Sequence, residues 1–154
     1  MTNDDKHNEV LSMYKTLAFT TLAAMILTTT TAFADGHRTP APEGASVYII
    51  SPANGAEVTS PVTVRFGLKG MGVAPAGTEK KKTGHHHLII DTKLKDYDNA
   101  VPADENHKHF GGGQTETTIE LKPGKHTLQL ILGDHNHIPH EPVVESKIIS
   151  IIVK

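Results

Sequence analysis

Histidine is the residue type in this sequence whose number and spacing point most directly to chemistry. The chain has 154 residues and 11 histidines. Eight of the histidines fall in three short segments, which are His85-His86-His87, His107-Lys108-His109, and His135-Asn136-His137 with His140. Imidazole is a ligand for zinc, copper, nickel and iron. A bias of this kind therefore indicates a metal-binding protein.

The first histidine segment leads into apolar residues and predicts a strand that carries two ligands on one face. Residues 88–90 are Leu-Ile-Ile, a composition that favours a half-buried strand. Side chains alternate along a strand, so His85 and His87 share one face while His86 lies on the other. Two imidazoles at this spacing stand side by side and suit chelation of one metal ion.

The other two segments supply the remaining candidate ligands. His109 precedes a run of glycines at 111–113, where the backbone can fold tightly. His137 and His140 flank Pro139, which stiffens the loop and reduces the entropy lost when a site closes. We predict a metal site built from three or four of five histidines: His85, His87, His109, His137 and His140. His107 and His135 are weaker candidates.

Several polar residues near these segments are given structural roles. His86 and His126 share strand faces with apolar residues, which predicts that they pack at the edge of the core or orient the ligands. Asp91 and Asp134 can accept an imidazole N–H or cap a turn. No nucleophile with a neighbouring base is found, so we predict no catalytic residues.

Composition excludes other kinds of site and of partner. The chain has no cysteine, which excludes thiolate chemistry and a blue-copper centre. Its net charge is −2. Without residues 1–34 it carries 13 basic and 14 acidic residues, since Lys6, Lys15, Asp4, Asp5 and Glu9 are lost. A charge near neutrality argues against a nucleic-acid partner.

Residues 1–34 have the pattern of a leader with a secretory signal peptide. An apolar run at 17–27 follows Lys15, and a small-residue cleavage site ends at Ala34. The run is shorter than the ~20 residues that a membrane-spanning helix needs. The acidic residues before Met13 do not fit a leader, so Met13 is a second candidate for the start. We expect cleavage after Ala34, a periplasmic location and no membrane span in the mature chain.

Cleavage after Ala34 creates a further candidate site at the new amino terminus. The mature chain would begin Asp35-Gly36-His37. The α-amino group of Asp35, two backbone amides and the imidazole of His37 can surround one ion with four nitrogens. That arrangement is square-planar, which suits copper(II) or nickel(II) and excludes tetrahedral zinc.

The elements that must position these histidines are short strands. We predict a flexible lead-in at 35–45, rich in proline and charge, and one β domain at 46–154. Six segments carry strand signals: 46–50, 61–68, 84–91, 115–121, 125–132 and 143–153. Long connections at 92–114 and 134–142 separate some of them. No segment has a helical period, so the prediction is an all-β, antiparallel two-sheet sandwich, immunoglobulin-like or cupredoxin-like.

Three phrases of the sequence resemble a family of bacterial exported proteins known as domain of unknown function 4399. They are TGHHHLIIDT, HFGGGQTETTIELKPGKHTLQLILGDHNHIPH and the closing ESKIISIIVK. The resemblance covers 51–154 and implies a small periplasmic β domain. It implies no activity, so the function must come from the residues.

We therefore expect an exported, periplasmic metal-binding protein that acts as a carrier, buffer or scavenger. Copper(II) is the first expected metal and zinc the second. Two alternatives stay open. One is a structural module that binds another envelope protein and no metal. The other is a metalloenzyme with an open histidine-ligated site, of the dismutase or hydrolase kind. A dismutase is the weakest of these alternatives, because the sequence has no copper–zinc bridging pattern.

Overall fold

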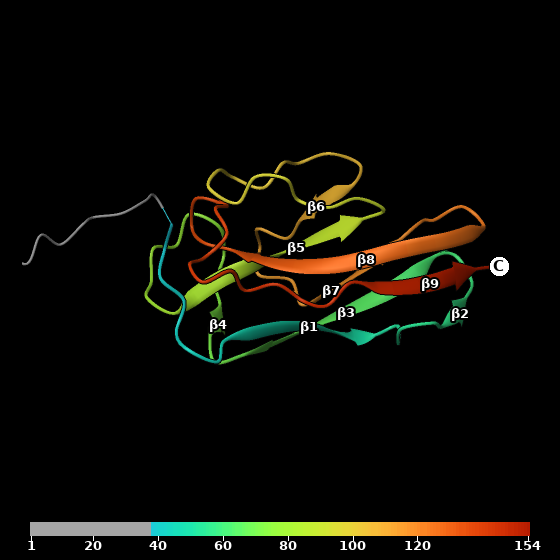
Figure 1. The fold of residues 1–154 in the computed structure, drawn as a ribbon, viewed down its shortest axis with the longest axis horizontal. Coiled ribbons are helices and arrows are strands. Elements are labelled where there is room, and N and C mark those ends of the chain that lie inside the picture. Colours follow the sequence, from blue (N-terminus) through green and yellow to red (C-terminus); the bar gives the residue numbers. More distant parts are fainter. Residues whose placement is uncertain (1–37) are drawn as a thin grey trace, which may run out of the picture. The chain divides into compact units, whose positions relative to one another are not determined.

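The computed structural model describes residues 38–154, and strands with alternating apolar residues build two facing β-sheets from them (Figure 1). The smaller sheet has the order β1-β3-β7. Its strands are β1 (Ser46–Ser51), β3 (Val62–Lys69) and β7 (Glu116–Ile119). Both pairings in this sheet are antiparallel.

The larger sheet has six strands, with the order β2-β9-β8-β5-β4 and β6 paired beside β5. Its strands are β2 (Glu57–Val58), β9 (Ile149–Val153), β8 (Gly124–Gly133), β5 (Thr83–Ile90), β4 (Gly72–Val73) and β6 (His107–His109). The central pairings are antiparallel, and the short strands β2 and β4 pair in parallel. The predicted all-β two-sheet sandwich is confirmed.

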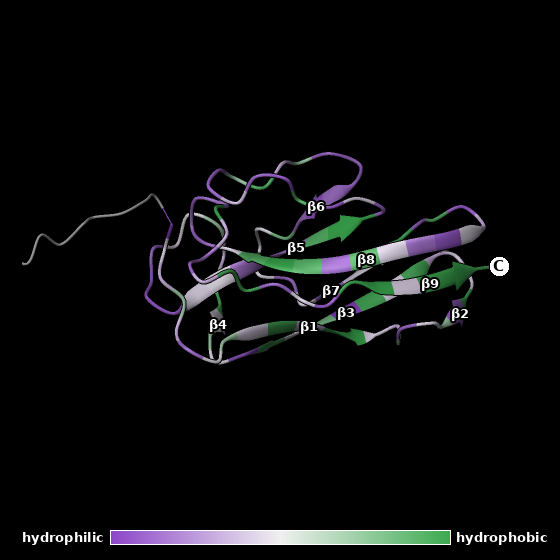
Figure 2. Ribbon diagram, viewed as in Figure 1, coloured by the Kyte–Doolittle hydropathy of each residue, from purple (hydrophilic) through white to green (hydrophobic). Residues whose placement is uncertain are grey.

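The main core lies between the sheets and follows from the alternation of side chains. Val62, Val64 and Phe66 of β3 are buried, while the residues between them are exposed. The leucines of β8 and alternate residues of β5 and β9 meet them from the larger sheet. Figure 2 shows long hydrophobic stretches in β5, β8 and β9. Burial of this apolar area is what holds the sandwich together.

A second, smaller core covers the outer face of the larger sheet. Ile89 of β5 and Ile131 of β8 point outward and are covered by Leu94 and Val101, with Tyr97 at the edge. These covering residues belong to the long connection between β5 and β6. Strand β5 is therefore buried on both faces, from Gly84 to Ile90.

Several segments differ from the sequence prediction, and the short strands β2, β4 and β6 were not predicted at all. His107–His109 was expected within a loop but forms β6, because it pairs with the edge of β5. Strand β9 begins at Ile149, although the segment before it still bonds to β8 through Val144 and Ser146. The described part of the lead-in pairs with Glu141 through Pro40 and Ala41.

Within residues 38–154, no helix has the length and apolar composition needed to cross a membrane.

Candidate metal centre

Strand β5 places two histidines on the outer face of the larger sheet, in line with Ile89. His85 and His87 are both fully buried. Their Nε2 atoms lie 3.1 Å apart and their ring centroids 4.9 Å apart. The spacing predicted from the sequence thus gives two imidazoles that face each other above the sheet.

The edge strand β6 adds a third histidine beside them. His109 is the direct partner of His87 in the antiparallel pairing of β5 with β6. Its ring centroid lies 5.1 Å from that of His87 and 4.9 Å from that of His85. His109 is the exposed member of the group, so the group meets solvent on this side.

The loop after β8 brings a fourth histidine over the same face. Gly133, at the end of β8, bridges Pro139, so the chain between them forms a tight turn. His137 lies in this turn with φ of 67°, in the left-handed region that side chains rarely adopt. Its Nδ1 is 3.1 Å from Nε2 of His85. Three segments far apart in the sequence therefore meet at one point.

These four histidines form a group with the dimensions of a metal site. One ring nitrogen from each of His85, His87, His109 and His137 lies within 4.8 Å of the others. A metal ion bonded to four imidazoles at about 2.0–2.1 Å in a tetrahedron holds the nitrogens about 3.3 Å apart. Two of the nitrogen pairs, from His85 to His87 and from His85 to His137, are 3.1 Å apart.

The ring separations are closer to a tetrahedron than to a plane. In a square-planar site two opposite pairs of ligands are clearly farther apart than the other four. Here five of the six centroid separations are 4.7–5.1 Å, and one, from His87 to His137, is 6.0 Å. The group resembles a tetrahedron with one edge opened.

Burial keeps the imidazoles of His85 and His87 neutral. Loss of solvation, followed by repulsion from the neighbouring His109 and His137, lowers the pKa of His85 to about 4. Burial, followed by repulsion from His85, lowers the pKa of His87 to about 2. The pKa of His109 is also lowered, chiefly by burial. A neutral imidazole has the free lone pair that a metal requires.

The hydrogen bonding of the two buried ligands also favours a cation between the rings. The Nδ1 atoms of His85 and His87 are buried without a hydrogen-bond partner in the described part of the chain. Their Nε2 atoms face each other, and Nε2 of His85 also faces Nδ1 of His137. A neutral ring has one N–H and one lone pair, and each needs its own hydrogen-bond partner. A ring whose Nδ1 has no partner therefore cannot satisfy both of its nitrogens. A metal ion would bond the nitrogens that converge.

Two glycines leave room for the ligand rings, because a side chain at either position would overlap with a histidine. A Cβ on Gly133, which pairs with His85 across the sheet, would lie 2.8 Å from Nε2 of His87. A Cβ on Gly111 would lie 2.3 Å from Cε1 of His109. Gly133 escapes notice in the sequence because only the register of β5 against β8 reveals its neighbour. Gly111 carries a signal, since it stands two residues after a candidate ligand.

Three other candidate ligands lie outside the four-histidine group. His140 is fully buried, and its two ring nitrogens each lie 3.2 Å from a backbone oxygen, of Leu132 and of Thr83. It links the end of β8 to the start of β5. His107 bonds to Asp104, with Nδ1 2.8 Å from the carboxylate. His135 contacts the side chain of Asn136.

The residues given structural roles have distinct places. His86 points into the main core against Phe66, with ring centroids 5.2 Å apart. His126 lies 2.6 Å from the carboxylate of Asp91, and this hydrogen bond raises its pKa. Asp134 caps the turn that holds His137. The predicted terminal site of Asp35 and His37 lies outside the described residues.

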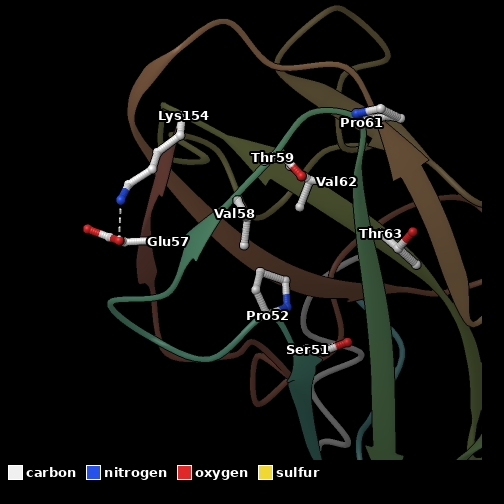
Figure 3. Close-up of a pocket in the computed structure, with 9 residues that line it drawn as sticks. All are labelled: Ser51, Pro52, Glu57, Val58, Thr59, Pro61, Val62, Thr63 and Lys154. Carbon is white, nitrogen blue, oxygen red and sulfur yellow. Dashed lines mark ion pairs between the residues drawn. The ribbon is translucent and has the colours of Figure 1, made fainter.

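A separate pocket lies at the other end of the sandwich (Figure 3). Its volume is about 600 Å³. Its charged residues are Glu57 and Lys154, whose side chains pair at 2.5 Å. The lining holds no histidine, so this pocket offers no second group of metal ligands.

Comparison with known proteins identifies the family and nothing closer. The searches of curated proteins and of solved structures found no match. A family model described as Domain of unknown function (DUF4399) matches residues 64–154, which is more than half of the chain and includes all four histidines of the group. The chain belongs to this family.

Proposed function

We propose that this protein binds one divalent metal ion through His85, His87, His109 and His137, and that it works as an exported carrier, buffer or scavenger of that metal. The observation that carries the proposal is the convergence of four ring nitrogens within 4.8 Å, from two strands and a loop. Histidines that serve only packing or turns have no reason to direct nitrogens at one another.

Copper(II) is the first metal of the proposal and zinc the second. A site of nitrogen donors generally binds copper(II) more tightly than zinc. The near-tetrahedral ring arrangement suits zinc and forces copper(II) away from its preferred plane. We therefore propose a smaller preference for copper(II) than free imidazole ligands would give, and a visible spectrum typical of a distorted copper site.

The carrier role draws on the uneven burial of the ligands. His85 and His87 are buried, His137 is half-buried and His109 is exposed. Two buried ligands would hold the ion on the side of the sheet, and the exposed ligand would lie between the ion and solvent. The ion can then leave or enter the site on the side of the exposed ligand. Export rests on the leader pattern of residues 1–34 alone.

The test is a zinc and copper(II) titration of the chain that starts at Asp35, purified without an affinity tag. Zinc reports on the four-histidine group by itself, because the proposed terminal site excludes tetrahedral ions. We expect one equivalent of zinc bound more tightly than micromolar, and loss of that equivalent in His85→Ala/His87→Ala. His126→Ala, outside the group, is the matched control.

Two outcomes would contradict the proposal. An affinity for zinc no tighter than micromolar would leave the protein-binding module as the better account. Normal zinc binding by the double variant would place the metal elsewhere. A bound ion that keeps an exchangeable water would instead revive the metalloenzyme.

A further inference from the structure

We propose that residues 38–41, which we call the strap, are a working part of the metal site, because Thr39 positions His137 through the carboxylate of Asp134. This inference rests on the proposed function. The strap precedes residue 64, where the family match begins. It therefore adds a supporting element that the matched region does not contain.

The first step is that Asp134 shapes the turn carrying the fourth ligand. Its Oδ1 accepts the backbone N–H of Asn136 at 2.8 Å and of Ile138 at 3.0 Å. The backbone N–H of His137 also bonds to the carbonyl oxygen of Asp134, at 2.9 Å. These bonds hold His137 in its left-handed conformation, which is uncommon for residues other than glycine.

The second step is that the strap satisfies the other oxygen of this carboxylate. Asp134 is 1% exposed. Its Oδ2 accepts the hydroxyl of Thr39 at 2.5 Å. A hydrogen bond to a buried carboxylate is among the stronger ones, and its loss leaves a charged oxygen without solvent or a partner among residues 38–154. Removal of the Thr39 hydroxyl is therefore expected to disturb Asp134 and the turn that it caps.

The third step is that the strap itself is firmly attached beside this turn. The N–H of Ala41 bonds to the oxygen of Glu141 at 2.8 Å, and the N–H of Glu141 bonds to the oxygen of Thr39 at 3.0 Å. Arg38 donates to the backbone oxygens of Pro139 and His140 and pairs with the Glu141 carboxylate. These bonds fix the position of the strap, and so they hold the Thr39 hydroxyl next to the carboxylate of Asp134.

The consequence is a chain of positioning contacts that ends at one ligand. His137 faces His85 with its Nδ1, 3.1 Å from Nε2. A small shift of the turn moves this nitrogen and leaves the three ligands on β5 and β6 in place. Loss of a group that orients a metal ligand typically lowers affinity by about 10–100-fold. We expect a loss of this size from Thr39→Val, with Thr39→Ser close to the parent chain.

The experiment measures zinc affinity by competition with a chelator in a double-mutant cycle. Thr39→Val is combined with His137→Ala. The control is Thr63→Val, which removes a hydroxyl that is bonded to Thr118 within the smaller sheet. If Thr39 acts through His137, Thr39→Val has no further effect once His137 is replaced. An equal loss of affinity in both backgrounds, or no loss in either, overturns the proposal.

A second measurement separates this inference from the proposed function. Amide hydrogen exchange of the metal-free protein reports directly on the bonds from Asn136 and Ile138 to Asp134. We expect faster exchange at both amides in Thr39→Val, and unchanged exchange in Thr39→Ser and Thr63→Val. Unchanged exchange in Thr39→Val refutes the positioning role, whereas failure of the parent chain to bind zinc refutes the proposed function alone.

Discussion

Acid should destabilise the metal-free protein well above the pH at which its carboxylates titrate. The cause is the buried pair His85 and His87, whose pKa values are lowered to about 4 and about 2 by burial and by the neighbouring imidazoles. In the unfolded chain both titrate near 6.5. Between these values the unfolded state binds more protons than the folded state, so stability falls as the pH falls.

The size of the effect follows from these shifts. At pH 5 an unfolded histidine is almost fully protonated, while His85 and His87 in the folded chain remain mostly neutral. Each residue then lowers the free energy of unfolding by about 2 kcal/mol relative to pH 7.5. The pair together removes up to about 4 kcal/mol, a large share of the stability of a small domain.

Urea denaturation in the presence of a chelator, at steps from pH 7.5 to pH 5, measures this loss. The variant His85→Leu/His87→Leu is the control, and its profile should be much flatter over the same range. His126 acts in the opposite direction, because its bond to Asp91 raises its pKa and its contribution is lost as the pH rises. His126 is half-buried, and its partner Asp91 is exposed, so solvent screens the pair and keeps this contribution small.

A flat stability profile in the parent chain would refute the reasoning. That result would mean that the two imidazoles are solvated or already charged at neutral pH, and that the site is not preformed. Equal acid sensitivity in the leucine variant would assign the effect to other groups.

Four further predictions follow from the same geometry. Zinc at 100 times its dissociation constant should raise the free energy of unfolding by about 2.7 kcal/mol at pH 7.5, and no shift in the urea midpoint would count against a native-state site. Gly133→Ala should lower zinc affinity at least tenfold, because its Cβ would lie 2.8 Å from Nε2 of His87. Gly72→Ala, whose Cβ would have its nearest contact at 3.6 Å, is the control. Equal zinc affinities of the two variants would show that Gly133 is not needed to leave room for the ring of His87. His86→Leu should raise the free energy of unfolding by about 1 kcal/mol without changing zinc affinity, since both ring nitrogens of His86 are buried without a partner in residues 38–154. In the chain that starts at Asp35, His37→Ala should remove one equivalent of square-planar copper(II) and no zinc, and an unchanged copper spectrum would exclude the terminal site.

The fold was largely predictable because its strands carry local signals. The alternation in β3 and the leucines of β8 are such signals, and the structure buries both sets in the main core. The short strands β4 and β6 were missed because they exist only as partners of β5. A segment such as His107–His109 has no apolar pattern of its own, so its pairing depends on the edge that the rest of the sheet presents.

The site was predictable in its types of residue but only partly in its membership. His85 and His87 follow from the spacing of one strand, whereas His109 and His137 were candidates on the basis of neighbouring glycine and proline. His140 carries the same local signal as His137, yet its ring turns to backbone oxygens. The direction of a loop side chain depends on long-range contacts such as the one from Thr39 to Asp134, which spacing along the chain cannot reveal.

The two-sided burial of β5 also bears on how faithfully the chain folds. In the native register His85 lies opposite Gly133 and His87 opposite Ile131. A slip of one residue would turn every side chain of the strand to the opposite face, sending both ligands into the apolar core and leaving one histidine outside. Such a misfolded chain could not assemble four imidazoles around an ion. Metal added during refolding would therefore favour the native strand register, because only chains with that register would bind and retain the ion.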